Sequence, residues 1–75
     1  MTELPLVSGK EVLAAFERAG WLYVRRKGSH MIMIKSGMPV NLCVPDHREV
    51  DRGTLRKLIR LSRLNTEEFV GLLKE

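Results

Sequence analysis

The sequence has little of several residue types that define common protein classes. Its single cysteine, Cys43, excludes an internal disulfide and leaves no Cys-x-x-Cys spacing for zinc. No apolar run approaches the roughly 20 residues of a membrane-spanning helix, and the start lacks the pattern of a signal peptide. The glycines form no phosphate-binding loop, and the aromatic residues are too few for a base-stacking platform. We therefore expect a cytoplasmic protein with no membrane association, no metal and no cofactor.

What the sequence has is an excess of positive charge. Lysine and arginine number 13 against 9 aspartate and glutamate residues, which gives a net charge of +4. Such a balance favours a polyanionic partner such as RNA, or an acidic protein. The length fits one small domain that spans residues 1–75.

The first part of the chain carries the signals of a helix. Ser8 and Glu11 have the spacing of a capping box, in which each side chain bonds to the backbone of the other. Apolar residues then recur at helical spacing from Val12, and Gly20 suits the left-handed position at which many helices end. The pattern predicts a helix over residues 9–19.

Three short segments that follow have the composition of β-strands, at residues 21–25, 30–35 and 40–44. Turn signals around Gly28 and Gly37 separate them. Because connections this short cannot form the crossovers of a parallel sheet, we expect an antiparallel meander.

Helical signals return in the last part of the chain. Thr54 is a suitable N-cap, and the apolar spacing after it predicts a helix to about residue 64. Asn65 and Thr66 predict a new cap, followed by a last short helix that contains Phe69. The order α-β-β-β-α-α predicts an α+β fold, with the helices on one face of a three-stranded antiparallel sheet.

The tip of the first predicted hairpin combines charge with a group that can transfer protons. Residues 25–30 contain three cations, a glycine, a hydroxyl and an imidazole, in that order. Cations bind phosphate groups, and imidazole accepts or donates a proton near neutral pH. RNA supplies its own 2′-hydroxyl as a nucleophile, so that a base and electrostatic support can suffice. The catalytic candidate is His30, and the RNA-phosphate candidates are Arg25, Arg26, Lys27, Gly28 and Ser29. The alternative is an ordinary surface histidine in a basic hairpin.

The direction of His30 is open at this stage. In a regular strand His30 shares a face with Ile32 and Ile34, opposite Met31 and Met33. Either the two isoleucines lie on the outer face of the sheet, or a bulge changes the direction of His30.

Two further residues are secondary candidates. His47 could be a second acid/base group, although a solvated loop histidine is the simpler interpretation. Thr54, beside Gly53, could bind an anion through free helix amides, or act only as an N-cap. The two histidines have no evident third ligand, which argues against a metal site.

Short motifs in a fixed order carry a resemblance over nearly the whole chain. They are Leu4-Pro5, Ser8-Gly9-Lys10-Glu11-Val12, Ala19-Gly20-Trp21, Arg25, Lys27-Gly28-Ser29-His30, Val44-Pro45, His47, Gly53-Thr54-Leu55-Arg56 and Glu68-Phe69. The G-S-H and G-T-L elements are the most specific. With these motifs the chain resembles the HicA family of toxin mRNA interferases, which includes the YcfA-like proteins.

The resemblance implies a double-stranded-RNA-binding-domain-like α-β-β-β-α fold, here with a short extra C-terminal helix. It also implies a type II toxin, an endoribonuclease that cleaves mRNA, inhibits translation and is neutralised by a HicB-type antitoxin. The family's catalytic histidine corresponds to His30, and its glycine and serine to Gly28 and Ser29. Gly53-Thr54-Leu55 stands where true double-stranded-RNA-binding domains have a lysine cluster, so we expect single-stranded mRNA rather than a duplex.

Two other functions are compatible with the basic surface. The first is a non-catalytic RNA-binding module of the same fold, which would bind RNA with a steep salt dependence and release no products. The second is a protein-interaction domain that meets an acidic partner and has no affinity for RNA.

Overall fold

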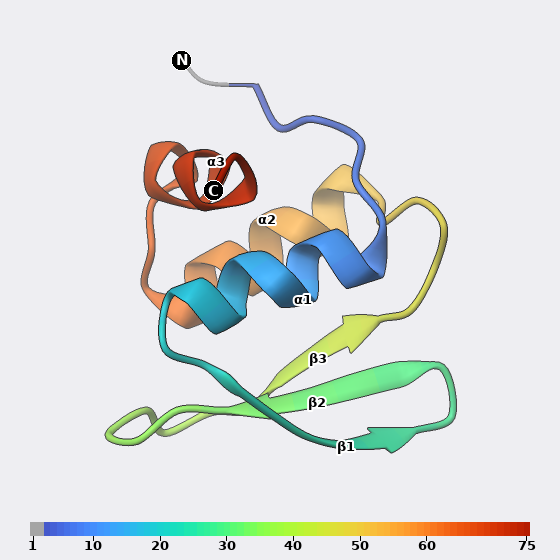
Figure 1. Ribbon diagram of the computed structural model, residues 1–75, viewed down its shortest axis with the longest axis vertical. Helices are drawn as coiled ribbons and strands as arrows, with labels where there is room; N and C mark the ends of the chain where they lie inside the picture. Colours follow the sequence, from blue (N-terminus) through green and yellow to red (C-terminus); the bar gives the residue numbers. More distant parts are fainter. Residues whose placement is uncertain (1–2) are drawn as a thin grey trace.

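The helices and strands of the computed structural model, which describes residues 3–75, follow the predicted order (Figure 1). They are α1 (Gly9–Arg18), β1 (Leu22–Lys27), β2 (His30–Ile34), β3 (Leu42–Pro45), α2 (Arg52–Ser62) and α3 (Thr66–Leu73). Residues 1 and 2 of the predicted domain lie outside the described residues. The strands pair antiparallel in the order β1-β2-β3. The predicted α+β, double-stranded-RNA-binding-domain-like fold is confirmed.

The helices lie on one side of the sheet (Figure 1). α1 contacts β1 and β3, and α2 contacts β3, whereas α3 contacts the other two helices. We call the sheet face turned away from the helices the outer face. No described helix covers it.

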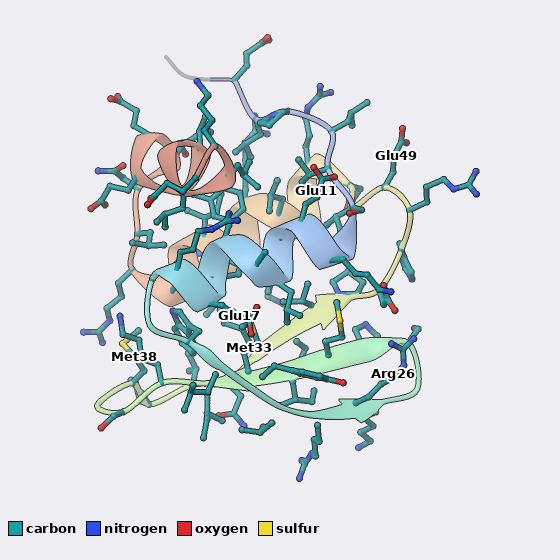
Figure 2. The ribbon with its side chains drawn as sticks, viewed as in Figure 1. Glu11, Glu17, Arg26, Met33, Met38 and Glu49 are labelled. Carbon is teal, nitrogen blue, oxygen red and sulfur yellow. The ribbon has the colours of Figure 1, made fainter. Side chains whose placement is uncertain are left out.

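The core lies between the sheet and the helices because each element has one apolar face. Met31 and Met33 of β2 are buried there, and Met33 lies between the sheet and α1 (Figure 2). Phe16 of α1 and Phe69 of α3 join the helices, with ring centroids 5.1 Å apart and the rings tilted by 47°. This tilted contact is a favourable aromatic geometry.

Two of the helices begin with a capping box. At α1, the Ser8 amide donates to Glu11 Oε1 at 2.9 Å and the Glu11 amide donates to Ser8 Oγ at 3.2 Å, as predicted. At α3, Asn65 and Glu68 make the same reciprocal pair. Each box satisfies two helix-terminal amides that have no partner within the helix.

The prediction that Thr54 caps α2 is wrong. The helix begins at Arg52, and its N-cap is Asp51, whose carboxylate accepts from the Thr54 amide at 3.0 Å. The cause lies outside the helix: the Val50 amide donates to the Val7 carbonyl at 2.8 Å, which holds the chain extended up to that point. Asp51 is the next residue, and it therefore takes the capping position.

The strands are shifted by a few residues from their predicted bounds. The first hairpin closes through a two-residue turn, Gly28 and Ser29, so that Lys27 still pairs with His30. Gly28 has a φ of +60°, which suits the first position of a type II′ turn. The tight turn places His30 at the first position of β2, next to the strand that carries the predicted cations.

Candidate active site

The strand register places His30 on the outer face. Met31 and Met33 point into the core, so the alternation of β2 directs His30 and Ile32 away from the helices. His30 is exposed, and its pairing partner on β1 is Lys27. Of the two arrangements that the sequence left open, the observed one therefore has the isoleucines of β2 on the outer face together with His30.

A bulge does occur, but on β1 rather than next to His30. Tyr23 pairs with Met33 and Arg25 pairs with Ile32, so that Val24 is the additional residue. Because one inserted residue reverses the faces of all that follow, Arg25 and Lys27 lie on the side of His30. Without the bulge these two cations would point toward the helices.

A shallow hollow opens on the outer face beside the imidazole. It has a volume of about 370 Å³ and is lined by Lys27, Gly28, His30, Ile32 and Cys43. Ile32 is only 7% exposed, although it lies outside the main core cluster. It pairs with Arg25 on β1 and with Cys43 on β3, and it forms an apolar floor beside a cation and an imidazole.

Arg26, by contrast, is already held by the protein. Its position opposite Met31 directs it to the side of the helices, near the hairpin end of the sheet (Figure 2). Its guanidinium donates from Nη1 to Asp46 Oδ2 at 2.7 Å and from Nε to the Gly28 carbonyl at 3.0 Å. The Asp46 amide in turn donates to the Ser29 carbonyl at 2.7 Å. Together these bonds fix the turn that precedes His30 to the segment that follows β3.

The electrostatics of Asp46 agree with this geometry. The hydrogen bond from Arg26 holds the pKa of the Asp46 carboxyl below its ordinary value of 3.8, and the charges of Lys10 and His47 act in the same direction. The carboxylate is therefore ionised at neutral pH, and its bond to Arg26 is charge-assisted.

His47 lies in the exposed loop after β3, separate from the hollow of His30. Its backbone carbonyl accepts from the Gly9 amide at 2.9 Å, which joins the loop to the start of α1. A Cβ on Gly9 would overlap the Pro45 carbonyl oxygen and would lie 2.9 Å from the Asp46 Cα, so the two backbones are in direct contact. The role of the His47 backbone in this contact is structural.

Thr54 lies on the other side of β3 from His30. Its amide is bonded to Asp51, and its side chain lines a second hollow, of about 270 Å³, between β3 and α2. The Asp51 carboxylate occupies this helix N-terminus, where a bound anion would be repelled.

The geometry therefore separates the candidates into groups. The structure brings Arg25, Lys27 and His30 together on the outer face, with Gly28 and Ser29 in the adjoining turn. It turns Arg26 to the other face and leaves His47 and Thr54 elsewhere. Within residues 3–75, no three His, Cys, Asp or Glu side chains group in a way that could hold a metal ion.

One family model matches the chain, and its description is HicA toxin of bacterial toxin-antitoxin. The match covers residues 9–64, about three-quarters of the chain. The chain belongs to the HicA toxin family. It is thus a toxin of a bacterial toxin–antitoxin system, a class that acts together with an antitoxin partner. A comparison with curated proteins gives no match.

The HicA match contains the whole outer-face site. It begins at the start of α1 and ends just after α2, so that it spans all three strands and both hollows next to β3. α3 and the N-terminal segment before Ser8 lie outside the match. None of the helices in the described part of this HicA chain has the length and apolar character needed to cross a membrane.

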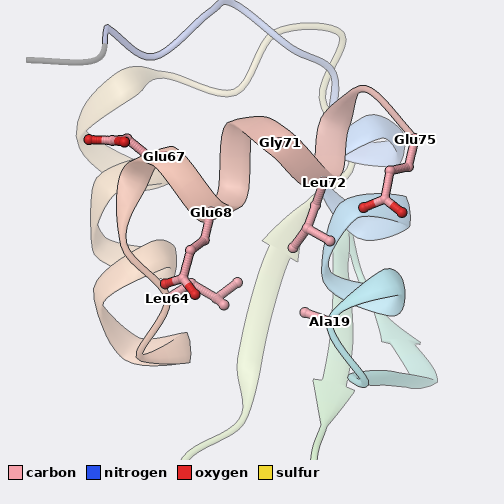
Figure 3. A pocket seen from close by; sticks show the side chains of 7 residues that line it. All are labelled: Ala19, Leu64, Glu67, Glu68, Gly71, Leu72 and Glu75. Atoms are coloured by element: carbon pink, nitrogen blue, oxygen red, sulfur yellow. The ribbon is translucent and has the colours of Figure 1, made fainter.

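A third hollow of this HicA protein lies among the helices, and none of its lining residues lines the hollow of His30 (Figure 3). Its lining includes the carboxylates of Glu67, Glu68 and Glu75, around the apolar side chains of Leu64 and Leu72. Three carboxylates repel phosphate groups, so this hollow is unsuited to RNA. The carboxylates of this hollow contrast with the cations of the outer face.

Sequence reasoning missed three participants in the outer-face site: Ile32 as its floor, Cys43 at its border and Asp46 as the partner of Arg26. Cys43 pairs with Ile32 across β2 and β3. The alternation of Cys43 with the apolar Leu42 and Val44 was the available signal, since it places the thiol on the outer face.

Proposed function

We propose that this HicA toxin is an endoribonuclease that cleaves mRNA without a metal ion, with His30 as its acid/base group. The observation that carries the proposal is the position of His30, which is exposed on the outer face and directly paired with Lys27. A cation beside an imidazole is the arrangement that holds a phosphodiester next to a proton acceptor.

In this scheme His30 takes the proton from an RNA 2′-hydroxyl, and the oxygen attacks the adjacent phosphorus. The bond to the 5′-oxygen then breaks and that oxygen takes up a proton from water, which leaves a 2′,3′-cyclic phosphate and a 5′-hydroxyl. Lys27 and Arg25 stabilise the negative charge that develops on the phosphorus-bound oxygens. The Ser29 hydroxyl adjoins them in the turn, while Arg26 positions the turn and does not contact the substrate.

The partner that we propose for the outer face is a HicB-type antitoxin. Leu22 and Ile34 pair across β1 and β2, yet they are 63% and 39% exposed. Apolar side chains that remain this exposed on the same sheet face as a basic site suit a protein partner with an apolar, partly acidic surface. An antitoxin bound there would cover His30 and exclude RNA.

The test is cleavage of RNA by the purified protein in EDTA, with His30→Ala as the variant. The wild type should cleave and arrest growth, whereas His30→Ala should do neither, because the proton acceptor is lost. Circular dichroism and the thermal midpoint should be unchanged, since His30 is exposed.

The matched variant His47→Ala shows whether the second histidine takes part in proton transfer. Undiminished cleavage by His30→Ala would exclude the proposed mechanism. Salt-dependent RNA binding by the wild type without products would indicate the non-catalytic RNA-binding module instead.

A further inference from the structure

The second hollow, between the free edge of β3 and α2, has no role in the scheme above. Its lining residues are Asn41, Cys43, Thr54, Lys57, Leu58 and Leu61. Leu58 is buried and Leu61 half-buried, so α2 supplies an apolar wall. The volume of about 270 Å³ is close to the lower limit of roughly 300 Å³ for pockets that hold small ligands.

The polar groups of this hollow match the parts of a nucleotide. The Asn41 amide offers both a donor and an acceptor, and the Thr54 hydroxyl can act as either, which suits the edge of a base. Lys57 is exposed and supplies a cation for a phosphate. The apolar wall suits the face of a base, in contrast to the acidic hollow among the helices.

The second hollow also joins the hollow of His30. Cys43 lines both of them, and it pairs with Ile32, the floor of the first. Asn41 precedes Cys43 by two residues, or about 6.6 Å along an extended chain. This is about the step between successive nucleotides of an extended strand. Cations lie at both ends, with Lys27 in one hollow and Lys57 in the other.

We propose that the second hollow is a nucleotide-binding subsite, which holds the RNA nucleotide one step away from the base that lies over Ile32. The strand crosses the edge of β3 at Cys43, Lys57 binds its phosphate, and Asn41 reads the base edge. The subsite rests on the proposed function, because it assumes that RNA occupies the His30 hollow. It would give the toxin a base preference at one fixed position beside the cut.

Binding of a fluorescein-labelled ribonucleoside monophosphate and of a labelled tetraribonucleotide to the His30→Ala protein tests the subsite. Lys57→Glu should weaken the binding of the tetranucleotide about tenfold and affect the mononucleotide much less, because only a strand of two or more nucleotides reaches from the His30 hollow to Lys57. Lys74→Glu is the matched control, because it changes the net charge equally at an exposed position outside both hollows. It should alter both affinities less than threefold.

Sequencing of cleavage products from Asn41→Ala gives the second measurement. The base preference at one position beside the cut should disappear, while His30-dependent cleavage continues. Equal weakening by Lys57→Glu and Lys74→Glu, or an unchanged cleavage profile, would overturn the subsite alone. A failure of the proposed function would look different. The wild type would then not cleave RNA, but the tetranucleotide would still bind more tightly than the shorter ligand, and Lys57→Glu would still weaken that binding.

Discussion

Arg26 and Lys27 are adjacent cations in β1, yet the sheet turns them to opposite faces with different tasks. Lys27 points to the outer face, where we propose that the RNA binds, whereas Arg26 donates hydrogen bonds to Asp46 and to the Gly28 carbonyl. An ion pair that is this exposed contributes little to global stability. Its effect is local, because it holds the turn from which His30 emerges.

Removal of the Asp46 carboxylate should therefore affect cleavage more than folding. For Asp46→Ala we expect the single-turnover rate of RNA cleavage to fall roughly tenfold or more, because the displaced turn moves His30 relative to the phosphate. The thermal midpoint should change little. Glu17→Ala, which removes an exposed carboxylate on α1, is the control and should cleave as the wild type does. Equal rates for the two variants would contradict the positioning role of Arg26.

At the scale of elements, the start of α1 and the segment after β3 meet backbone to backbone. Gly9 is buried there, its amide bonded to the His47 carbonyl, with no space for a side chain. Glycine is needed at position 9 because the two backbones approach each other closely, and not because the residue has an unusual φ angle. This contact fixes the helix against the same segment that Arg26 holds from the other side.

Gly9→Ala should destabilise the protein although alanine is the better helix former. The added methyl would meet main-chain atoms that cannot move aside, and such overpacking costs about 1–3 kcal/mol in the free energy of unfolding. Gly71→Ala in α3 is a matched control, since its methyl has no atom within 4 Å and should stabilise the protein by up to ~1 kcal/mol. Urea unfolding of both variants measures the difference, and the same sign for both would refute the explanation.

Most elements were predictable from the sequence, because their signals are local. The capping box at Ser8, the turn at Gly28 and the break at Asn65 fixed the order and type of the elements. The first residue of α2 was not predictable, since Asp51 and Thr54 are both good N-caps and a long-range bond of Val50 decides between them.

The composition of the site was only partly predictable for a similar reason. His30 is recognisable as a proton-transfer group, and its proposed role still rests on the RNA experiment. The alternation of a strand separates Arg26 from Arg25 and Lys27, but the bulge at Val24 decides that Arg25 and Lys27 are the two that share the face of His30. No glycine or other local signal marks that bulge, so the faces of β1 follow only from its pairing with β2.

For the molecule as a whole, the segment before α1 is an integral part of the fold. Leu4 is buried in the core, its carbonyl accepts from Arg52 Nε at 2.9 Å, and Val7 bridges to Val50. These contacts join the N-terminal segment to α2, across most of the sequence. Leu4 and Val7 themselves precede the part of the chain that the family model matches, whereas their partners lie within it.

Leu4→Ala should accordingly lower the free energy of unfolding by about 2–5 kcal/mol, a large part of the stability of a small domain. Leu6→Ala is its neighbouring control: Leu6 is 55% exposed, and its loss should change stability by less than about 0.5 kcal/mol. Thermal and urea unfolding report both values. Similar values for the two variants would mean that the segment before α1 does not contribute to the core.

The position of Cys43 has a practical consequence for work on this toxin. It is the only thiol of the chain, it is exposed, and it lies where the two hollows meet. A disulfide between two molecules would therefore bring their outer faces together and hide both His30 sites. Air-oxidised preparations would lose the proposed RNA cleavage without any unfolding, and a reducing agent would restore it.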